Sequence, residues 1–338
     1  MSEAKYYQKL SKGSLRCNLC PHYCDLAEGE RGKCGVRKNE KGKLLAENYG
    51  LISSVHLDPI EKKPLYHYYP SASILSIGSV GCNLSCSFCQ NCDISQTTVD
   101  DYPWLRQHTV EQVLAYNDQY SNNIGIAYTY NEPTVYFEFM MDLAVESKKQ
   151  GLKNVMVSNG YIATEPLREV LEPIDAFNID LKAFSNEFYR KFADARLNPV
   201  KENLKTIRKA GKHLEITNLI IPGLNDDEKE FEEMIKWIYN ELGEFTVLHL
   251  SRYFPAYRMQ YPPTPTETIS RLFEISKLHL PYTYTGNLNF PPGQHTRCHQ
   301  CDTLLIERKN GYLTKIKAMD DKGKCLTCKT RILNYVKP

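Results

Sequence analysis

Short apolar runs alternate with longer helical patterns through the middle of the chain. Each run is rich in Val, Ile, Leu or aromatic residues, and most lack the polar alternation of a half-exposed strand. Continuous apolar runs are typical of parallel strands that are covered on both faces. We therefore predict strands within residues 74–80, 124–130, 155–158, 177–181, 214–221 and 246–250.

The stretches between these runs have the apolar spacing of helices. They cover residues 110–120, 134–149, 165–171, 186–192, 200–210, 226–242 and 267–278. Gly151 and Gly211 follow two of the expected helix ends, where glycine commonly stands. Alternating strands and helices predict a parallel sheet with helices outside it. The expected fold is α/β, a partial (βα)6 TIM-like barrel, although the periodicity alone also allows an open doubly wound sheet.

The two ends of the chain differ from this middle part. Residues 15–47 and 293–332 contain cysteines and are rich in Gly, Lys and polar residues. They predict small Cys-rich, metal-binding lobes at both termini. We place the N-terminal lobe at residues 1–68, the barrel at 69–283 and a zinc-ribbon-like C-terminal lobe at 284–338.

Composition and charge are those of an ordinary globular protein. Hydrophobic residues make up 42% and charged residues 24%, and the net charge of +2 implies no strongly basic or acidic partner. Residues 1–12 are polar and do not have the pattern of a secretion signal. No run approaches the roughly 18 consecutive apolar residues that a membrane helix needs. We expect a cytoplasmic protein without membrane contact.

The 12 cysteines are informative because they are clustered. The groups are Cys17, Cys20, Cys24 and Cys34; Cys82, Cys86, Cys89 and Cys92; and Cys298, Cys301, Cys325 and Cys328. Disulfides usually stabilise small secreted domains, whereas tight C-x2-C and C-x3-C groups in a larger chain are typical of metal sites. We therefore expect metal ligands.

The central group directly follows the first predicted barrel strand. Cys82, Cys86 and Cys89 have C-x3-C-x2-C spacing, so one loop can bind three corners of a cuboidal iron–sulfur cluster. Ordinary sites use four cysteines, and a three-cysteine loop leaves one iron without a protein ligand. The loop also leaves the carboxyl end of a strand, where barrel sites form. A zinc knuckle that includes Cys92 is the alternative. We interpret Cys92 itself as a small buried residue, with a spare thiol near the site or a fourth ligand at rest as the alternatives.

This loop resembles the signature of the radical S-adenosylmethionine (SAM) superfamily, which has an aromatic residue before the last cysteine. Phe88 holds that position here. The resemblance implies a [4Fe–4S] cluster on Cys82, Cys86 and Cys89, with SAM bound to the open iron. In that family one electron cleaves SAM to a 5′-deoxyadenosyl radical, which removes hydrogen from the substrate. A flavodoxin- or ferredoxin-type protein is the implied electron donor.

Further strand ends resemble SAM-binding motifs of the superfamily. The second strand ends in Asn131-Glu132-Pro, at the position whose acceptors hold the SAM ammonium in the family; proline at a helix start is the purely geometric alternative. Ser158-Asn159-Gly and Asp180-Leu-Lys182 resemble the pyruvate formate-lyase activating enzymes.

The resemblance implies SAM contacts at these strand ends. Lys182 suits the SAM carboxylate, with a plain Asp180–Lys182 ion pair as the alternative. At the sixth strand end we interpret His249 as a ribose or substrate contact, with a structural histidine as the alternative. The expected cofactor-binding residues are Phe88, Asn131, Glu132, Ser158, Asn159, Asp180, Lys182 and His249.

Residues 17–37, 58–67 and 284–287 narrow the resemblance. Together with 81–91 and 129–133, they are similar to the radical SAM proteins of the "AmmeMemoRadiSam system", from about residue 15 to the C-terminus. Those proteins often have Trp where this chain has Cys92. The resemblance implies Memo-type and AMMECR-type partner proteins and a relation to activating enzymes of glycyl radical enzymes. It fixes no reaction.

The two outer cysteine sets predict two separate metal sites. The C-terminal double C-x2-C pattern favours a closed, structural zinc site. The N-terminal C-x2-C-x3-C-x9-C set fits either zinc or an auxiliary [4Fe–4S] cluster, because spacing does not separate the two. A mixed site that draws cysteines from both ends is a further alternative. The C-terminal lobe is basic, but solvated lysines explain this better than a nucleic-acid partner.

Three hypotheses of function follow. The first is a radical SAM enzyme that acts on an unidentified substrate, with a glycyl-radical-enzyme activase as its rival subtype. The second is a non-catalytic zinc- and nucleic-acid-binding module. The third keeps the cluster for electron transfer alone, in which case Glu132, Asp180 and Lys182 should be dispensable.

Overall fold

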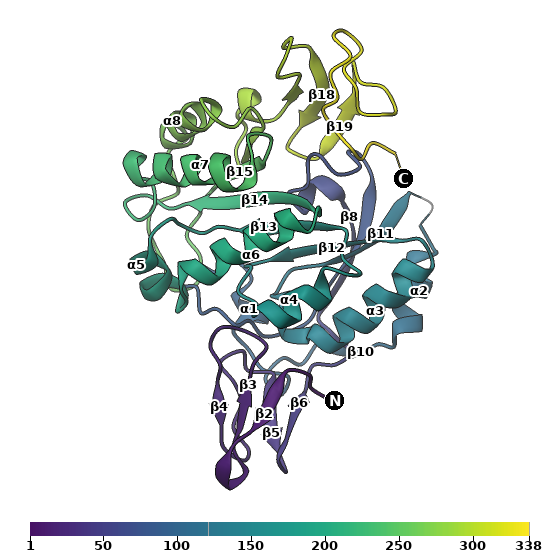
Figure 1. The fold of residues 1–338 in the computed structure, drawn as a ribbon, viewed down its shortest axis with the longest axis vertical. Coiled ribbons are helices and arrows are strands. Elements are labelled where there is room, and N and C mark those ends of the chain that lie inside the picture. The colour runs from purple at the N-terminus through teal and green to yellow at the C-terminus, as the bar shows by residue number, and fades with distance from the viewer. Residues whose placement is uncertain (121, 338) are drawn as a thin grey trace.

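The computed structural model describes residues 1–120 and 122–337, so the last residue of the predicted lobe 284–338 lies outside the described residues. One eight-stranded sheet forms the centre of the molecule (Figure 1). Its strands are β8 (Ser54–Pro59), β9 (Ser73–Gly78), β11 (Asn123–Tyr128), β12 (Lys153–Ser158), β13 (Ala176–Asp180), β14 (His213–Ile220), β15 (Val247–Arg252) and β16 (Thr283–Gly286). Neighbouring strands from β9 to β16 pair in parallel, whereas β8 pairs antiparallel with β9. The predicted α/β class with a parallel sheet is confirmed.

The order of the strands decides between the two predicted topologies. From β9 to β16 the strands lie side by side in chain order, and β8 flanks β9 at the edge. A doubly wound sheet reverses its order at a switch point, and this sheet does not. The sheet is therefore wound in one direction, which is consistent with a partial barrel.

The six predicted strands correspond to β9 and β11–β15, and the structure adds β8 and β16. Strand β8 escaped prediction because it is an edge strand with polar positions at His56 and Asp58. Strand β16 has only four residues, too few for a clear pattern. The domain boundaries stay a prediction, although β8, within residues 1–68, joins the central sheet.

Helices cover the outer side of the sheet. They are α1 (Cys92–Ser95), α2 (Val110–Asn117), η3 (Pro133–Tyr136), α3 (Phe137–Lys149), α4 (Thr164–Val170), α5 (Asn186–Phe188), the π-helical turn η4 (Tyr189–Ala193), α6 (Leu197–Lys209), α7 (Glu228–Leu242) and α8 (Thr266–Lys277). Helix α3 packs on β11 and β12, α6 on β14, and α8 on β15 and β16. All seven predicted helical stretches are confirmed, and two of them divide, 134–149 into η3 and α3 and 186–192 into α5 and η4.

Local signals in the sequence set the helix ends. Thr109 and Gln112 form a reciprocal capping box at the start of α2. The Asp227 side chain accepts from the backbone N–H of Glu230 at the start of α7, and Gly243, at φ 99°, ends that helix. These capping contacts determine where the two helices begin and where α7 ends.

Two small lobes lie at opposite ends of the molecule's long axis (Figure 1). The N-terminal lobe consists of β1 (Ser2–Glu3), β2 (Tyr7–Lys9), η1 (Ser11–Gly13), β3 (Leu15–Cys17), β4 (Asp25–Leu26), β5 (Arg37–Glu40), β6 (Lys43–Ala46) and β7 (Leu51–Ile52), the last of which pairs with β10 (Arg106–Gln107). A buried ion pair joins this lobe to α3, because Arg37 Nη1 lies 2.9 Å from Glu138 Oε2.

The C-terminal lobe follows η5 (Pro291–Gly293) and contains β17 (Thr296–Arg297), β18 (Leu304–Lys309) and β19 (Leu313–Ile316). It packs on the loop that carries η2 (Ile60–Lys62) and the residues after it. Arg308 is fully buried, stacks 4.1 Å above the Tyr66 ring and donates to the Tyr66 carbonyl at 2.8 Å. This contact holds the lobe against the main sheet.

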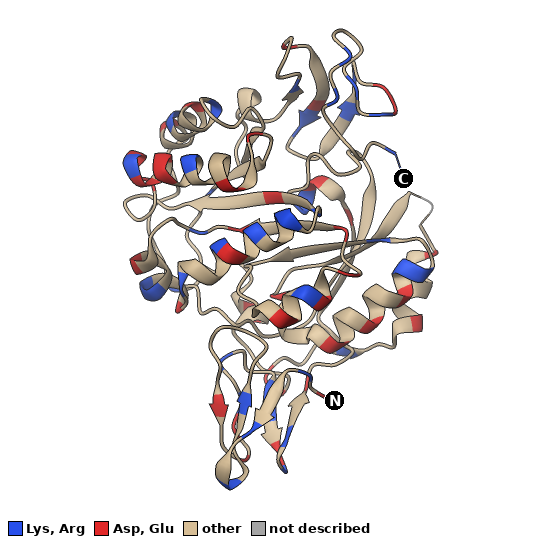
Figure 2. Cartoon of the chain, viewed as in Figure 1, with Lys and Arg blue, Asp and Glu red and all other residues tan. Residues whose placement is uncertain are grey.

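Charges of both signs are interspersed along the outward helix faces (Figure 2), as the small net charge of the sequence suggests. Among the described helices, none combines the length and the apolar content that crossing a membrane requires.

Candidate active site

A cavity of about 350 Å³ lies at the carboxyl ends of the central strands. Parallel strands that end at one edge bring their following loops together, and here those loops follow β9, β11, β12 and β13. The predicted residues that line the cavity are Cys82, Cys86, Phe88, Cys89, Asn131, Glu132, Ser158, Asn159, Asp180 and Lys182. The structure thus brings together every residue of the predicted central site except His249.

The three cysteines of the central loop surround this space without converging on one point. No three of the described central thiols lie within 4.8 Å of one another, so they do not form a single-ion site. Cys82 Sγ accepts from the backbone N–H of Leu84 at 3.4 Å and faces Asn159 Nδ2 at 3.7 Å. Amide donors of this kind stabilise cluster-bound thiolate. The donor set therefore fits a group larger than one ion.

Burial makes Cys82 and Cys86 weaker acids than an ordinary thiol. It raises the pKa of Cys86 to about 11, although Lys182 opposes the rise. Burial also raises the pKa of Cys82 well above its usual value, and the Glu132 carboxylate adds to this. A metal centre that takes thiolates must therefore displace protons when it binds.

Glu132 is the centre of a buried hydrogen-bond network. Its Oε1 accepts from the Thr134 hydroxyl at 2.6 Å and the Ser158 hydroxyl at 2.8 Å, and its Oε2 accepts from the backbone N–H of Asn159 at 2.8 Å. Asn159 in turn donates to Asn83 Oδ1 at 2.8 Å. The carboxylate thus fixes the loop after β12 against the cysteine loop, a role that sequence patterns did not reveal.

Asn131 has a similar structural use. Its Oδ1 accepts from the backbone N–H of Ser79 at 2.9 Å, and its Nδ2 donates to the Gly81 carbonyl at 2.9 Å. The side chain thereby attaches the end of β11 to the start of the cysteine loop.

Lys182 presents a positive charge at the other side of the cavity. Its ammonium lies 2.9 Å from Asp180 Oδ2 and 5.8 Å from the centre of the Phe88 ring. Burial alone lowers the pKa of Lys182, but Asp180 and Cys86 outweigh it and hold the pKa above its usual value. Lys182 therefore stays charged at neutral pH and can bind a carboxylate.

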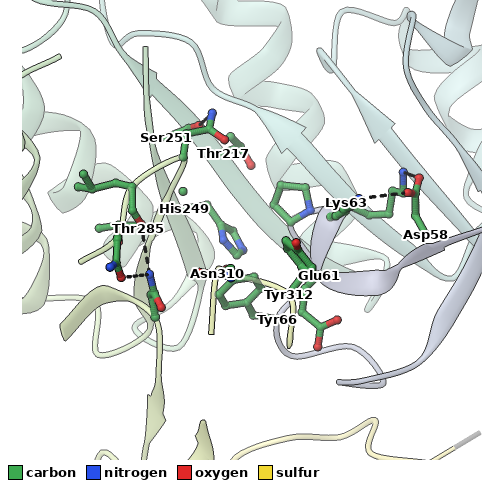
Figure 3. Close-up of a pocket in the computed structure, with 18 of the residues that line it drawn as sticks. Asp58, Glu61, Lys63, Tyr66, Thr217, His249, Ser251, Thr285, Asn310 and Tyr312 are labelled. Carbon is green, nitrogen blue, oxygen red and sulfur yellow. Dashed lines mark hydrogen bonds and ion pairs between the residues drawn. The ribbon is translucent and has the colours of Figure 1, made fainter. Parts of the chain in front are cut away.

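A second, larger cavity of about 820 Å³ adjoins the first (Figure 3). Its walls come from the loop after β8, from the ends of β14, β15 and β16, and from the C-terminal lobe. The residues that line both cavities are Lys62, Lys63, Tyr130, Thr217 and Ser251. The two spaces are thus neighbours with a common wall.

Lys63 and Tyr130 of that common wall form a tight group with Asp58 of the larger cavity. Lys63 Nζ lies 2.7 Å from Asp58 Oδ2, the contact drawn in Figure 3, and 4.6 Å from the Tyr130 ring centre. The Tyr130 hydroxyl donates to the same carboxylate at 2.6 Å. Burial lowers the pKa of Lys63, and Asp58 opposes this. Sequence reasoning gave Asp58 and Lys63 no role, although the stretch 58–67, which contains both, was a signal that could have found them.

His249 lies in the larger cavity and not beside the cysteines. Its Nε2 is 2.6 Å from Glu215 Oε2, a fully buried carboxylate that also accepts from the backbone N–H groups of Tyr66 and His67. This placement separates His249 from the other predicted SAM contacts, and because His249 lines the larger cavity, its role as a ribose or substrate contact stays a prediction beside that of a structural histidine.

Cys92 differs from its prediction as a small buried residue. It is half-buried on the first turn of α1, its sulfur faces Asp93 at 3.7 Å, and it does not line the cavity of the other central thiols. The helix that starts at Cys92 turns this side chain away from the site.

The outer cysteines form two separate sets, as predicted, and not one mixed site. Sulfur atoms of Cys298, Cys301, Cys325 and Cys328 all lie within 4.8 Å of one another, as the ligands of one ion do. Cys17, Cys20, Cys24 and Cys34 line a different cavity in the N-terminal lobe.

Comparison with known proteins agrees with this geometry. Residues 76–238 match the family model described as the Radical SAM superfamily. An uncharacterized protein of Methanocaldococcus jannaschii is 42% identical over 337 residues, which are 98% of this chain and 99% of that protein. The chain belongs to the radical SAM superfamily.

One sequence relative and one solved structure show how far the likeness extends. The pyruvate formate-lyase 1-activating enzyme of Escherichia coli (strain K12) is 25% identical over 175 residues, 49% of this chain and 65% of that enzyme. A radical SAM methyltransferase from Sphaerobacter thermophilus has a TM-score of 0.50 at 17% identity, over 65% of this chain and 68% of that chain, and shows the fold alone.

This radical SAM protein is an enzyme, so the hypothesis of a non-catalytic zinc- and nucleic-acid-binding module is wrong. When bound, a [4Fe–4S] cluster and SAM supply the one-electron cleavage that yields a 5′-deoxyadenosyl radical for hydrogen abstraction.

Proposed function

We propose that this radical SAM enzyme removes a hydrogen atom from a small polar substrate held in the larger cavity. The observation that carries the proposal is the wall shared by the 820 Å³ cavity and the cysteine cavity. The volume lies within the roughly 300–1,000 Å³ range of small-molecule sites. Side chains of Asn287, Asn289 and Gln294 give it polar partners.

The residues of the smaller cavity receive distinct roles in this proposal. Cys82, Cys86 and Cys89 hold the cluster and leave one iron for SAM. Lys182 binds the SAM carboxylate, and Phe88 packs beneath the Lys182 ammonium. The hydrogen-bond network of Glu132 in the smaller cavity positions the site, because it holds the loops after β9 and β12 together.

A glycyl-radical-enzyme activase is the second candidate, favoured by the homology to pyruvate formate-lyase activating enzymes. An activase must admit the backbone of a partner protein to the barrel mouth. Here the turn between β18 and β19, with Asn310, Gly311 and Tyr312, walls the larger cavity. This wall favours a small molecule over a polypeptide loop.

An anaerobic assay separates these candidates. The reconstituted enzyme is reduced with SAM, and 5′-deoxyadenosine is measured by chromatography after addition of either the ultrafiltrate or the retained protein fraction of a cell extract. We expect stimulation by the ultrafiltrate, its weakening in Tyr312→Ala, which removes part of the cavity wall, and no product from Cys82→Ala. Stimulation by the protein fraction alone would instead establish the activase.

Four cysteines of the C-terminal lobe are proposed to hold structural zinc. Cys298 and Cys328 sulfurs are 3.4 Å apart, and those of Cys301 and Cys325 are 3.7 Å apart. Tetrahedral zinc with bonds of about 2.3 Å places its sulfurs about 3.8 Å apart. The Thr330 hydroxyl lowers the pKa of Cys328 to about 6, which favours the thiolate that zinc binds. Zinc content should fall by about one per chain in Cys325→Ala and stay unchanged in Cys92→Ala.

The remaining features of the proposal rest on the sequence resemblance. They are membership in the AmmeMemoRadiSam group, Memo-type and AMMECR-type partner proteins, a flavodoxin- or ferredoxin-type electron donor and a cytoplasmic location. Reconstitution with each donor, and co-purification with each partner type, are the measurements that address them.

A further inference from the structure

Four cysteines of the N-terminal lobe line a cavity that the proposed reaction does not use. Cys17 ends β3, Cys20 and Cys24 follow in the next loop, and Cys34 precedes β5. Apolar side chains of Leu19 and Val135 complete much of the wall. All four thiols thus face one small space between the lobe and η3.

The spacing of these thiols differs from that of the C-terminal set. No three of the described N-terminal thiols lie within 4.8 Å of one another, whereas all four C-terminal ones do. Among the described N-terminal thiols no sulfur pair makes a hydrogen-bond contact like the 3.4 and 3.7 Å pairs of the C-terminal lobe. One zinc ion needs every sulfur pair at about 3.8 Å. The N-terminal thiols are arranged like the central three, around a larger group.

The absence of close pairs also bears on the type of cluster. In a [2Fe–2S] cluster two thiolates share each iron, so two sulfur pairs should be as close as they are around one ion. In a cubane each thiolate binds a different iron, and all four sulfurs stay apart. The lack of a close sulfur pair among the described N-terminal thiols favours the cubane.

A buried cation adds an independent indication of an anionic occupant. Arg37 lines this cavity and is 1% exposed. Its Nη atoms bind Glu138 at 2.9 Å, but its Nε–H has no hydrogen-bond partner among the described residues. A buried donor without a partner costs about 1–3 kcal/mol. A cluster with four thiolates is an anion that can accept this hydrogen bond.

The cavity lies directly beside the central cysteine loop. Asn83 forms part of its wall, and the preceding residue, Cys82, lines the active-site cavity. The Cys34 carbonyl lies so near Gly81 that a side-chain Cβ there would be 2.5 Å from it. A group bound in the N-terminal lobe would therefore be one residue removed from the central site.

We propose that Cys17, Cys20, Cys24 and Cys34 hold a second [4Fe–4S] cluster. The proposal rests on the geometry of these thiols and on Arg37, and it does not depend on the proposed substrate.

A variant without the central ligands tests this proposal. Cys82→Ala, Cys86→Ala and Cys89→Ala are combined, and the protein is reconstituted anaerobically with iron and sulfide. We expect about four irons and about four sulfides per chain to remain, with the Mössbauer spectrum of a four-iron cluster. This variant retains every N-terminal residue, and it also keeps Gly81 and Asn83, the loop residues that contact that lobe.

Two further pairs of substitutions, each added to the central variant, locate the remaining iron. Adding Cys20→Ala and Cys24→Ala should remove it, whereas adding Cys298→Ala and Cys325→Ala should leave the iron and lower the zinc. The proposal fails if the central variant carries zinc in place of iron, or if its spectrum is that of a two-iron cluster. Formation of 5′-deoxyadenosine by the wild type is scored separately, because that activity reports the central cluster.

Discussion

Lys182 and Glu132, two residues of the active-site cavity, differ in how much of their hydrogen-bonding capacity remains free for a ligand. The ammonium of Lys182 has one carboxylate partner, Asp180, which is itself about one-third exposed. Glu132 accepts from four donors on Thr134, Ser158 and Asn159. Binding should therefore depend on Lys182, and the shape of the site on Glu132.

The Lys182→Met variant should weaken SAM binding. A charge-assisted hydrogen bond contributes about 1.5–3 kcal/mol, so Kd should rise roughly ten- to hundred-fold. Equilibrium binding to the reconstituted enzyme measures this change. Lys191→Met is the control, because Lys191 also lies over a phenylalanine, 5.2 Å from the Phe192 ring, but is exposed and outside the cavity. An unchanged Kd for Lys182→Met would refute the proposed role.

The Glu132→Gln variant should lower the stability of the protein, because Glu132 bonds to neighbouring loops. The glutamine amide has one acceptor oxygen, so one of the buried N–H or hydroxyl donors meets an NH2 group. We expect a loss of about 1–3 kcal/mol in the free energy of unfolding, measured with chemical denaturant. Glu146→Gln, on the exposed side of α3, should change it little. Equal stability of both variants would contradict the network.

At the scale of elements, the junction between the N-terminal lobe and the cysteine loop depends on Gly81. This residue has φ 88°, and its missing side chain leaves room for the Cys34 carbonyl and for Val36. A turn that is left-handed and also in contact with another backbone accepts only glycine.

The Gly81→Ala variant should therefore be more disruptive than glycine replacement elsewhere. Gly151 has a similar φ of 79° with no atom near its missing Cβ, so Gly151→Ala should cost only the left-handed strain, about 1–2 kcal/mol. Gly81→Ala adds a clash at 2.5 Å and should cost more. It should also lower the iron retained after reconstitution. Denaturant unfolding and iron analysis compare the two variants. Similar losses of stability and iron in both would mean that the N-terminal lobe shifts to accommodate a side chain at position 81.

At the scale of the whole molecule, one network of buried polar side chains joins the sheet to the C-terminal lobe. Glu215 of β14 binds the loop after η2 through backbone N–H groups. His67 of that loop is 2.6 Å from the Tyr284 hydroxyl of β16, and Arg308 of β18 reaches the Tyr66 carbonyl. Four segments that are separate in the sequence thus share one interior.

The stability of the molecule should fall in mild acid because of His67. Burial lowers its pKa from 6.5 to about 3, so the folded state stays neutral while the unfolded chain takes up a proton below about pH 6.5. The stability that neutral His67 contributes is fully present above its pKa in the unfolded chain. It is lost as the pH falls toward its pKa in the folded protein. The slope approaches about 1.4 kcal/mol per pH unit.

Denaturant unfolding at about pH 6 and about pH 5 measures this slope. His67→Gln, which keeps a polar contact to Tyr284 but does not titrate, should show a shallower dependence than the wild type. His56→Gln replaces an exposed histidine and should not change it. An identical slope in all three proteins would mean that His67 is not kept neutral by burial.

The sequence by itself determined the local features of this protein. Apolar runs such as 74–80 predicted the inner strands, because a strand covered on both faces has no polar side to interrupt the pattern. The C-x3-C-x2-C loop and the strand-end motifs identified the residues around the smaller cavity, because parallel strands end at one edge. Edge strand β8 and the short β16 had too weak a pattern to be found.

Only the tertiary structure decided which atoms remain free to act. It showed that Glu132 and Asn131 are engaged by neighbouring loops, that His249 faces the larger cavity, and that Lys63 and Tyr130 lie in the wall between the cavities. These facts depend on contacts between segments distant in the chain, and no local pattern encodes them. The distances between thiols, which separate one ion from a cluster, arise in the same way.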